Sequence, residues 1–373
     1  MRKRPADRAG RDRPDDGGGR RMKGAALQNS IGLALPLAVS FVISGLVLLG
    51  IGENPFAVFS LMAGEAFGNA LRLAATLSAA TPLLFTATAT AICFRSGVFN
   101  VGVEGAFLVG GLGAVFLGFT LPASLGLALV PICLAFAALL GAIWLYLPGA
   151  LLARYEVDEV VSTLMLNFIA AAITGYLVNG PLLSPVSGNN VTPLIHEAAF
   201  LPRLMPPSTL HAGFLIGLIC VAAYGLWCVR TPSGFEGALV GLNKRFSRAV
   251  GISVPRMIIL VMVLSGILAG LGGAVHGLGQ MHRFSDGFSP GYGFTGMAVA
   301  LLGRNTPVGI ALGAVLFGAL ASAGTTIQLF SDIPLDLVNI IQGTVMIFAV
   351  VEIGHILHRR KTGGKTGGGQ YAD

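Results

Sequence analysis

Long apolar stretches separated by short polar segments run through most of this chain. A helix needs about 20 mostly apolar residues to cross roughly 30 Å of hydrocarbon, and most of these stretches reach that length. We therefore predict an all-α integral membrane protein, a polytopic helical bundle of about ten transmembrane spans. The predicted spans are 31–52, 73–94, 97–119, 122–147, 160–178, 211–229, 257–281, 294–303, 308–330 and 335–353.

The run 294–303 is only about half the length that a crossing helix needs. Non-helical backbone at membrane depth is tolerated only where protein covers it or where it lines a water-filled cavity. We therefore expect a broken or re-entrant helix here, held inside the bundle.

Composition and charge agree with a membrane protein and indicate its orientation. The chain is 54% hydrophobic and 11% charged, whereas soluble domains carry about 25% charged residues. Short basic loops are retained in the cytoplasm. With both termini inside, Arg72, Arg203 and Arg283 are the only ones of the 24 Lys and Arg that fall outside. The net charge of +7 thus reflects orientation in the lipid membrane, and we expect no nucleic-acid partner.

The same pattern divides the chain into three parts. Residues 1–23 form a basic tail too polar to bury a core, which predicts a disordered cytoplasmic segment. Residues 24–354 form the transmembrane domain, and 355–373 form a second basic cytoplasmic tail. Within the domain, 179–210 is rich in Pro, Ser and Asn and is predicted to be an external loop.

The loop 230–256 is cytoplasmic in this scheme and holds five cations against one acid. Pro232, Gly234 and Gly237 predict an irregular lead-in. A short helix over 242–250 should follow, ending at Gly251 and lying across the membrane face.

Three short stretches resemble nucleotide-binding or catalytic motifs, but each lacks a residue or a structural setting that the motif requires. Residues 364–366 read Gly-Lys-Thr, yet position 359 is Arg where a phosphate-binding loop needs its first Gly. The patterns at 287–291 and 291–296 lack the strand–turn–helix setting that gives them meaning. No paired-histidine motif or acidic cluster for a metal is present in the sequence. We predict that the chain is not an enzyme and binds no cofactor or metal.

Several polar side chains fall at membrane depth, where they are costly and face the bundle interior. Asn100 and Glu104 lie one helical turn apart on the same face. Glu104 could pair with Arg95 or cap a neighbouring helix, or it could belong to a solute pathway. The candidate pathway residues are Asn100, Glu104, Asn167, Gln280, Asn339 and Gln342, each of which could equally join helices.

Four stretches carry a family resemblance. FNVGVEG at 99–105, the run 157–167, the segment 241–252 and FSPGYGFTGMAVALLGRNTPVG at 288–309 resemble bacterial ABC importer permeases of the branched-chain amino acid and simple sugar superfamily. The closest likeness is to the nucleoside and simple sugar branch. The last stretch is the most specific, because hydropathy alone does not explain it.

The resemblance implies a permease subunit of an ATP-driven importer in the bacterial plasma (inner) membrane, moving nucleosides or simple sugars by alternating access. It implies three partners: an ATPase subunit that binds ATP and Mg, a sister permease that makes a heterodimer, and an external substrate-binding protein. ATP hydrolysis would then occur on the separate subunit. The helix near 242–250 would be the coupling helix, with Leu242, Asn243, Lys244, Arg245, Arg248 and Gly251 contacting the ATPase.

Two points remain open. Asp158 stands where the branch is expected to have Asn, which puts any role of that position in doubt. An ion-coupled secondary transporter of a small polar solute is the alternative, although such a carrier needs inverted repeats and embedded ion ligands.

Overall fold

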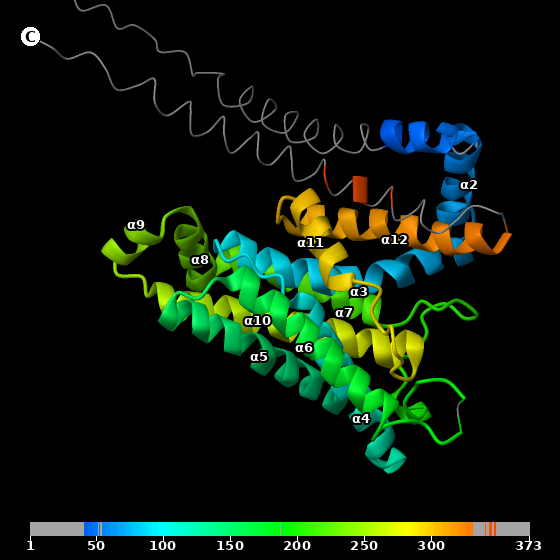
Figure 1. Ribbon diagram of the computed structural model, residues 1–373, viewed down its shortest axis with the longest axis horizontal. Helices are drawn as coiled ribbons and strands as arrows, with labels where there is room; N and C mark the ends of the chain where they lie inside the picture. Colours follow the sequence, from blue (N-terminus) through cyan, green and yellow to red (C-terminus); the bar gives the residue numbers. More distant parts are fainter. Residues whose placement is uncertain are drawn as a thin grey trace, which may run out of the picture.

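The computed structural model describes residues 41–50, 52, 54–186, 188–330 and the single positions 340, 343, 344 and 347. Within these residues the protein is all-helical, with two isolated β-bridges and no strand. Figure 1 shows the helices packed into one elongated bundle.

A helix at Phe41–Gly50 precedes the labelled elements. They are α2 (Pro55–Phe67), α3 (Ala70–Arg95), α4 (Val103–Thr120), η1 (Ala123–Ala128), α5 (Leu129–Tyr155), α6 (Glu159–Asn179), η2 (Glu197–Ala199), α7 (Gly213–Arg230), α8 (Pro232–Leu242), α9 (Lys244–Ala249), α10 (Val254–His276), the π-helical turn η3 (Gly277–Met281), α11 (Tyr292–Leu302) and α12 (Pro307–Phe330).

Seven described helices are long and apolar enough to cross a membrane. They correspond to the predicted spans 73–94, 97–119, 122–147, 160–178, 211–229, 257–281 and 308–330, and these predictions are confirmed in position. The run 31–52 is described only in part, while most of 335–353 and both tails, 1–23 and 355–373, lie outside the described residues. The total of about ten spans is therefore not confirmed.

The short run near 294–303 is a helix of 11 residues, α11, as its length predicted. The chain before it, from His282 to Gly291, is not helical, and Gly287 and Gly291 have left-handed φ angles of +73° and +92°. Gly293, Met297 and Val299 are among its buried residues, and α11 packs against α3, α4 and α12. The helix α11 is therefore held inside the bundle, as expected, whereas residues 283, 286, 287 and 290 of the irregular segment before it are exposed.

Two predictions about local structure are wrong, one about where a span begins and one about a segment expected to be irregular. The span expected from position 97 begins at Val103, because Gly97 is left-handed (φ +69°) and residues 96–102 are irregular. The irregular lead-in of the basic loop is instead the helix α8. Pro232 is its first residue, where a missing N–H costs nothing, and the Thr231 hydroxyl accepts a hydrogen bond from Gly234 N at 3.1 Å.

Glycine sets the separation of the central helices. A Cβ atom on Gly266 of α10 would collide with the Gly141 carbonyl oxygen on α5, and one on Gly270 would lie 3.3 Å from the Gly141 Cα atom. Gly273 of α10 meets the Phe107 carbonyl oxygen on α4 in the same way. Such backbone contact lets dispersion forces hold helices together in lipid.

The two ends of the bundle differ. The α8–α9 pair lies at the left end in Figure 1, and the 180–212 loop with η1 lies at the opposite end. The basic loop and the predicted external loop are thus on opposite sides, as the charge pattern requires.

Candidate functional site

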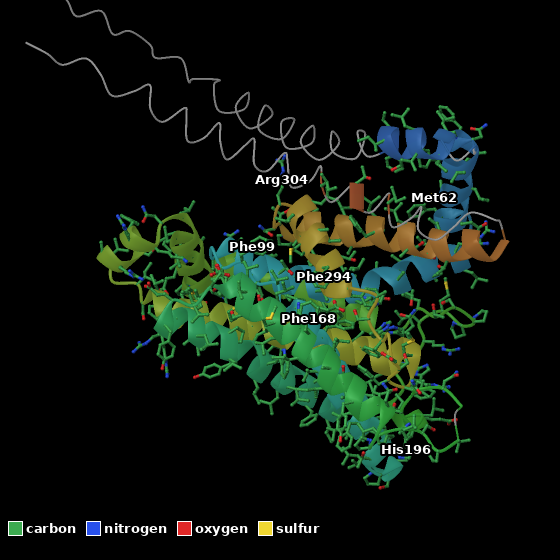
Figure 2. The ribbon with its side chains drawn as sticks, viewed as in Figure 1. Met62, Phe99, Phe168, His196, Phe294 and Arg304 are labelled. Carbon is green, nitrogen blue, oxygen red and sulfur yellow. The ribbon has the colours of Figure 1, made fainter. Side chains whose placement is uncertain are left out.

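A cavity of about 300 Å³ lies between α4, α6, the 284–289 segment and the start of α11. Figure 2 shows two of its lining side chains, Phe168 and Phe294, near the middle of the bundle, with His196 at the far end. Its α6 wall consists of Leu164, Asn167, Phe168, Ala171, Thr174, Gly175 and Val178. These positions recur every three or four residues, so the cavity follows one face of α6 for about 21 Å at 1.5 Å per residue. We call it the α6 groove.

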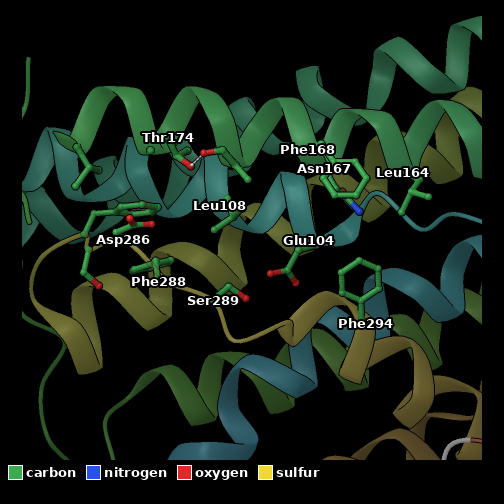
Figure 3. Close-up of a pocket in the computed structure, with 16 residues that line it drawn as sticks. Glu104, Leu108, Leu164, Asn167, Phe168, Thr174, Asp286, Phe288, Ser289 and Phe294 are labelled. Atoms are coloured by element: carbon green, nitrogen blue, oxygen red, sulfur yellow. Dashed lines mark hydrogen bonds between the residues drawn. The ribbon is translucent and has the colours of Figure 1, made fainter. Parts of the chain in front are cut away.

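Glu104 lies at one end of the α6 groove and is only 7% exposed. Its Oε2 atom accepts a hydrogen bond from Gly293 N, in the first turn of α11, at 2.6 Å. Figure 3 shows its carboxylate pointing into the cavity between Ser289 and Phe294. Glu104 was expected either to pair with Arg95 or to cap a neighbouring helix. The hydrogen bond from Gly293 N shows that it caps α11, and the described residues contain no ion pair between Glu104 and Arg95.

Asn167 reaches the same end of the groove from α6 and is 6% exposed. Its Oδ1 atom accepts from Gly105 N at 2.8 Å, and its Nδ2 atom donates to the Val101 carbonyl at 2.9 Å. One amide therefore satisfies a donor and an acceptor of a segment that would otherwise bury them unpaired. Asn167 both lines the cavity and fixes α4 to α6.

Asn100 is fully buried and does not line the α6 groove. Its Nδ2 atom donates to Ser265 Oγ at 3.0 Å, and its Oδ1 atom accepts from Gly102 N at 2.8 Å. It holds the irregular 96–102 segment against α10. Asn100 therefore bonds to α10 and Glu104 bonds to α11, although the two residues are only four positions apart in the sequence.

The remaining candidates are Gln280, Asn339 and Gln342, of which the structure describes only Gln280. Gln280 is half-buried on η3, outside the lining of the groove. Asn339 and Gln342 lie outside the described residues. Among the four candidates that the structure describes, Glu104 and Asn167 share the α6 groove, and the pathway role of all six stays a prediction.

Other lining residues were missed by reasoning from the sequence. They include Ser285, Ser289, Thr174 and Asp286, and Figure 3 shows Asp286 well away from Glu104 along the groove. The nearest sequence signal was the glycine-rich run that starts at Phe288. It indicated an irregular backbone there but did not indicate which helix this segment would contact.

Asp158, where the family resemblance led us to expect Asn, caps α6. One of its carboxylate oxygens accepts from Val160 N at 2.9 Å and from Val161 N at 3.0 Å. Asp and Asn are equally good at this position of a helix, so the departure leaves the local structure intact.

The predicted coupling segment is the α8–α9 corner, residues 242–251. Leu242 ends α8, and the Asn243 side chain caps α9 by accepting from Arg245 N at 2.9 Å and from Phe246 N at 3.0 Å. The expected helix over 242–250 is thus shorter, Lys244–Ala249, although Gly251 ends this segment with φ +89° as expected.

The α8–α9 corner presents apolar as well as basic side chains. Leu242 is 82% exposed, and Phe246 and Val250 are each 53% exposed. The cations Lys244, Arg245 and Arg248 are exposed around them. Phe246 and Val250 were not among the residues predicted to contact the ATPase. The sequence did contain a signal for them, because apolar residues in a polar loop outside any predicted span indicate a contact surface.

Gly241, the residue just before the α8–α9 corner, packs against the end of α3 with no side chain between the two backbones. A Cβ atom on Gly241 would collide with the Arg95 carbonyl oxygen, and one on Gly97 would lie 3.0 Å from the Gly241 Cα atom. Backbone therefore rests on backbone where α8 meets the start of the 96–102 segment.

A buried histidine lies at the end of the bundle that carries the 180–212 loop. His211 is 1% exposed, and its Nδ1 atom accepts from Gly213 N at 3.2 Å. Burial, with a smaller contribution from the charge of His282, lowers the pKa of His211 to about 4. The ring is therefore neutral at physiological pH.

Comparison with known families identifies the chain. The family described as the permease component of branched-chain amino acid transport systems matches residues 72–350, which contain the α6 groove and the α8–α9 corner. This protein belongs to that permease family. The permease is 35% identical to a guanosine ABC transporter permease protein of Bacillus subtilis, over 84% of this chain and 91% of the relative.

Two further relatives extend the comparison. A nucleoside ABC transporter permease protein of Lactococcus lactis is 32% identical, over 85% of this chain and 90% of its own. A glucose ABC transporter permease protein of Haloferax volcanii is 31% identical, over 85% and 86%.

The resemblance to the nucleoside and simple sugar branch is thereby confirmed. The protein is a multi-pass membrane permease subunit of an ABC importer, and ATP hydrolysis belongs to a separate subunit.

Proposed function

We propose that this permease imports nucleosides, with simple sugars as the second choice, by alternating access. The observation that carries the proposal is the α6 groove, a cavity with polar and aromatic lining inside a chain whose relatives include permeases named for guanosine, nucleosides and glucose. A volume of about 300 Å³ is within the range of small-molecule sites.

The lining favours a nucleoside. Phe168 and Phe294, which are 63% and 41% exposed, offer ring faces to a planar base. Stacking of a base on an aromatic side chain contributes about 1–3 kcal/mol. Polar groups of Asn167, Ser289 and Thr174 can then meet hydroxyl groups of the ribose or of a sugar.

The α8–α9 corner is the proposed contact with the ATPase. The predicted contact residues are exposed and mostly polar or basic, and the structure adds the exposed apolar side chains of Phe246 and Val250 to this surface. The predicted residues are Leu242, Asn243, Lys244, Arg245, Arg248 and Gly251. ATP and Mg bind the ATPase, whose closure moves the coupling segments. Nucleotide can drive this cycle only through a difference in affinity between the two states of the transporter.

The remaining assembly follows from the same proposal. A sister permease completes a heterodimer; in support, Bacillus subtilis has two different guanosine ABC transporter permease proteins similar to this chain. An external substrate-binding protein docks at the end that carries the 180–212 loop. About ten spans place both termini in the cytoplasm of a bacterium, since the basic segments are then inside.

Transport in proteoliposomes tests the proposal. The permease, its sister, the ATPase and the binding protein are reconstituted together, and uptake of labelled guanosine, uridine and glucose is measured with and without ATP. We expect ATP-dependent uptake of the nucleosides. Uptake by the permease alone, driven by an ion gradient, would instead establish the secondary transporter.

A further inference from the structure

Two helices begin at the same point of the α6 groove. The first helical residue of α4 is Val103 and that of α11 is Tyr292. Their backbones meet there, because a Cβ atom on Gly293 would lie 2.5 Å from Glu104 N. The first turn of a helix leaves N–H groups without partners inside the helix and carries a positive partial charge. Two such positive ends therefore converge at one wall of a cavity.

The chain supplies its own anion at this point. Glu104 belongs to the first turn of α4, and its carboxylate accepts the Gly293 N–H from the first turn of α11. A carboxylate is favoured at either position by the same partial charges. The two helix ends therefore do not need an anion from a solute.

The groove as a whole is acidic. Glu104 and Asp286 both line it, well apart along its length, and no Lys, Arg or His is found among the described residues that line it. An anionic solute would meet carboxyl oxygens and no counter-charge among these lining residues. An uncharged solute with hydroxyl groups would find carboxylate oxygens that accept hydrogen bonds.

We propose that Glu104 is a built-in counter-ion to the convergent ends of α4 and α11, and that it makes the α6 groove accept uncharged, hydroxyl-bearing solutes and exclude anionic ones. The proposal deepens the proposed function, on which it rests for the identity of the groove as the solute's route. It assigns the exclusion of phosphorylated or carboxylated solutes to Glu104, with Asp286 as a second contributor further along the groove.

Charged thiol reagents measure the potential inside the groove without any transport. Ala171 lines the groove and is exposed, so Ala171→Cys places a thiol there. The rate of reaction is measured with a cationic reagent, the trimethylammonium-ethyl methanethiosulfonate, and with its anionic sulfonatoethyl counterpart. The ratio of the two rates, relative to that for a free thiol in solution, cancels changes in the reactivity of the thiol itself. Protein without the introduced cysteine gives the blank for the native cysteines.

A unit charge about 10 Å away at an effective dielectric of about 20 should speed the cationic reagent and slow the anionic reagent by about 15-fold each, so we expect the normalised cation-to-anion ratio at position 171 to exceed one by roughly 200-fold. Glu104→Gln should lower the ratio by a similar factor, and Glu104→Asp should retain it. As a matched control, a cysteine at Ala249, at the other end of the bundle, should give a ratio that Glu104→Gln leaves unchanged.

Two results would overturn the proposal. One is a ratio at position 171 equal to that of a free thiol, and the other is a ratio that Glu104→Gln does not change in monodisperse protein. Should Glu104→Gln fail to fold, Asp286→Asn, at an exposed position well away from Glu104 along the groove, must lower the ratio, and an unchanged ratio would equally refute the acidic groove. Because these rates need no ATPase, a failed transport assay and a failed labelling assay are separate outcomes.

Discussion

Replacing Phe246 by alanine should weaken the binding of the ATPase to this permease by about 100-fold. The Phe246 side chain is 53% exposed in the isolated permease. An aromatic side chain offers about 200 Å² in all, so about 100 Å² remains to be buried by a partner. At about 25 cal/mol per Å² this burial contributes about 2.5 kcal/mol, which corresponds to nearly two powers of ten in the dissociation constant.

The assay is equilibrium binding of the purified ATPase to the permease pair in lipid nanodiscs. Phe116→Ala is the matched control, because Phe116 is 37% exposed but belongs to α4, away from the α8–α9 corner. The melting temperature of Phe246→Ala should stay close to that of the parent, since little of this side chain's packing is lost within the permease. A dissociation constant within about three-fold of the parent value would remove Phe246 from the interface and refute the assignment of the α8–α9 corner.

Three further predictions concern stability in detergent. Asn167→Ala leaves Gly105 N and the Val101 carbonyl unpaired and should cost about 2 to 4 kcal/mol; a melting temperature unchanged from the parent would contradict this. Gly293→Ala places a Cβ atom 2.5 Å from the backbone of α4 and should lower the free energy of unfolding by at least about 1–3 kcal/mol. Gly175→Ala is the control and should cost far less, because a Cβ atom there has nothing within 4 Å. Equal melting temperatures for the two variants would contradict the close approach of α11 to α4. The lowered pKa of His211 means that the unfolded chain binds a proton between about pH 6.5 and about pH 4 while the folded chain does not, so stability is full above this window and falls by about 3 kcal/mol across it. His211→Asn keeps an acceptor for Gly213 N and should flatten the pH profile of the melting temperature; a profile as steep as the parent's would refute the assignment.

The long helices were predictable because length and apolar composition alone decide whether a segment can cross a membrane. Their boundaries were less so. Residues 97–102 carry no charge and resemble the start of the helix that follows, but Gly97 is left-handed and the chain stays irregular up to Val103. The helix α8 was missed because Pro232 and its glycines resemble helix breakers, whereas proline at a first helical position is compatible with the helix.

The candidate site shows the same division. The cost of a buried carboxylate singled out Glu104, but its partner Gly293 is 189 positions away in the sequence, and no local pattern connects them. The membership of Thr174 and Asp286 in the groove depends on how α6 faces the 284–289 segment. Such packing is decided by the whole bundle, so these residues had no signal of their own.

The contact of Gly241 with Arg95 and Gly97 gives the α8–α9 corner a direct mechanical connection to the interior. With no side chain between the two backbones to rearrange and absorb a displacement, a push on α9 is transmitted through α8 to the segment that starts at Ser96. That segment carries Asn100 and leads within a few residues to Glu104. A force applied at the membrane surface therefore arrives, by way of a single short stretch of chain, at the wall of the cavity.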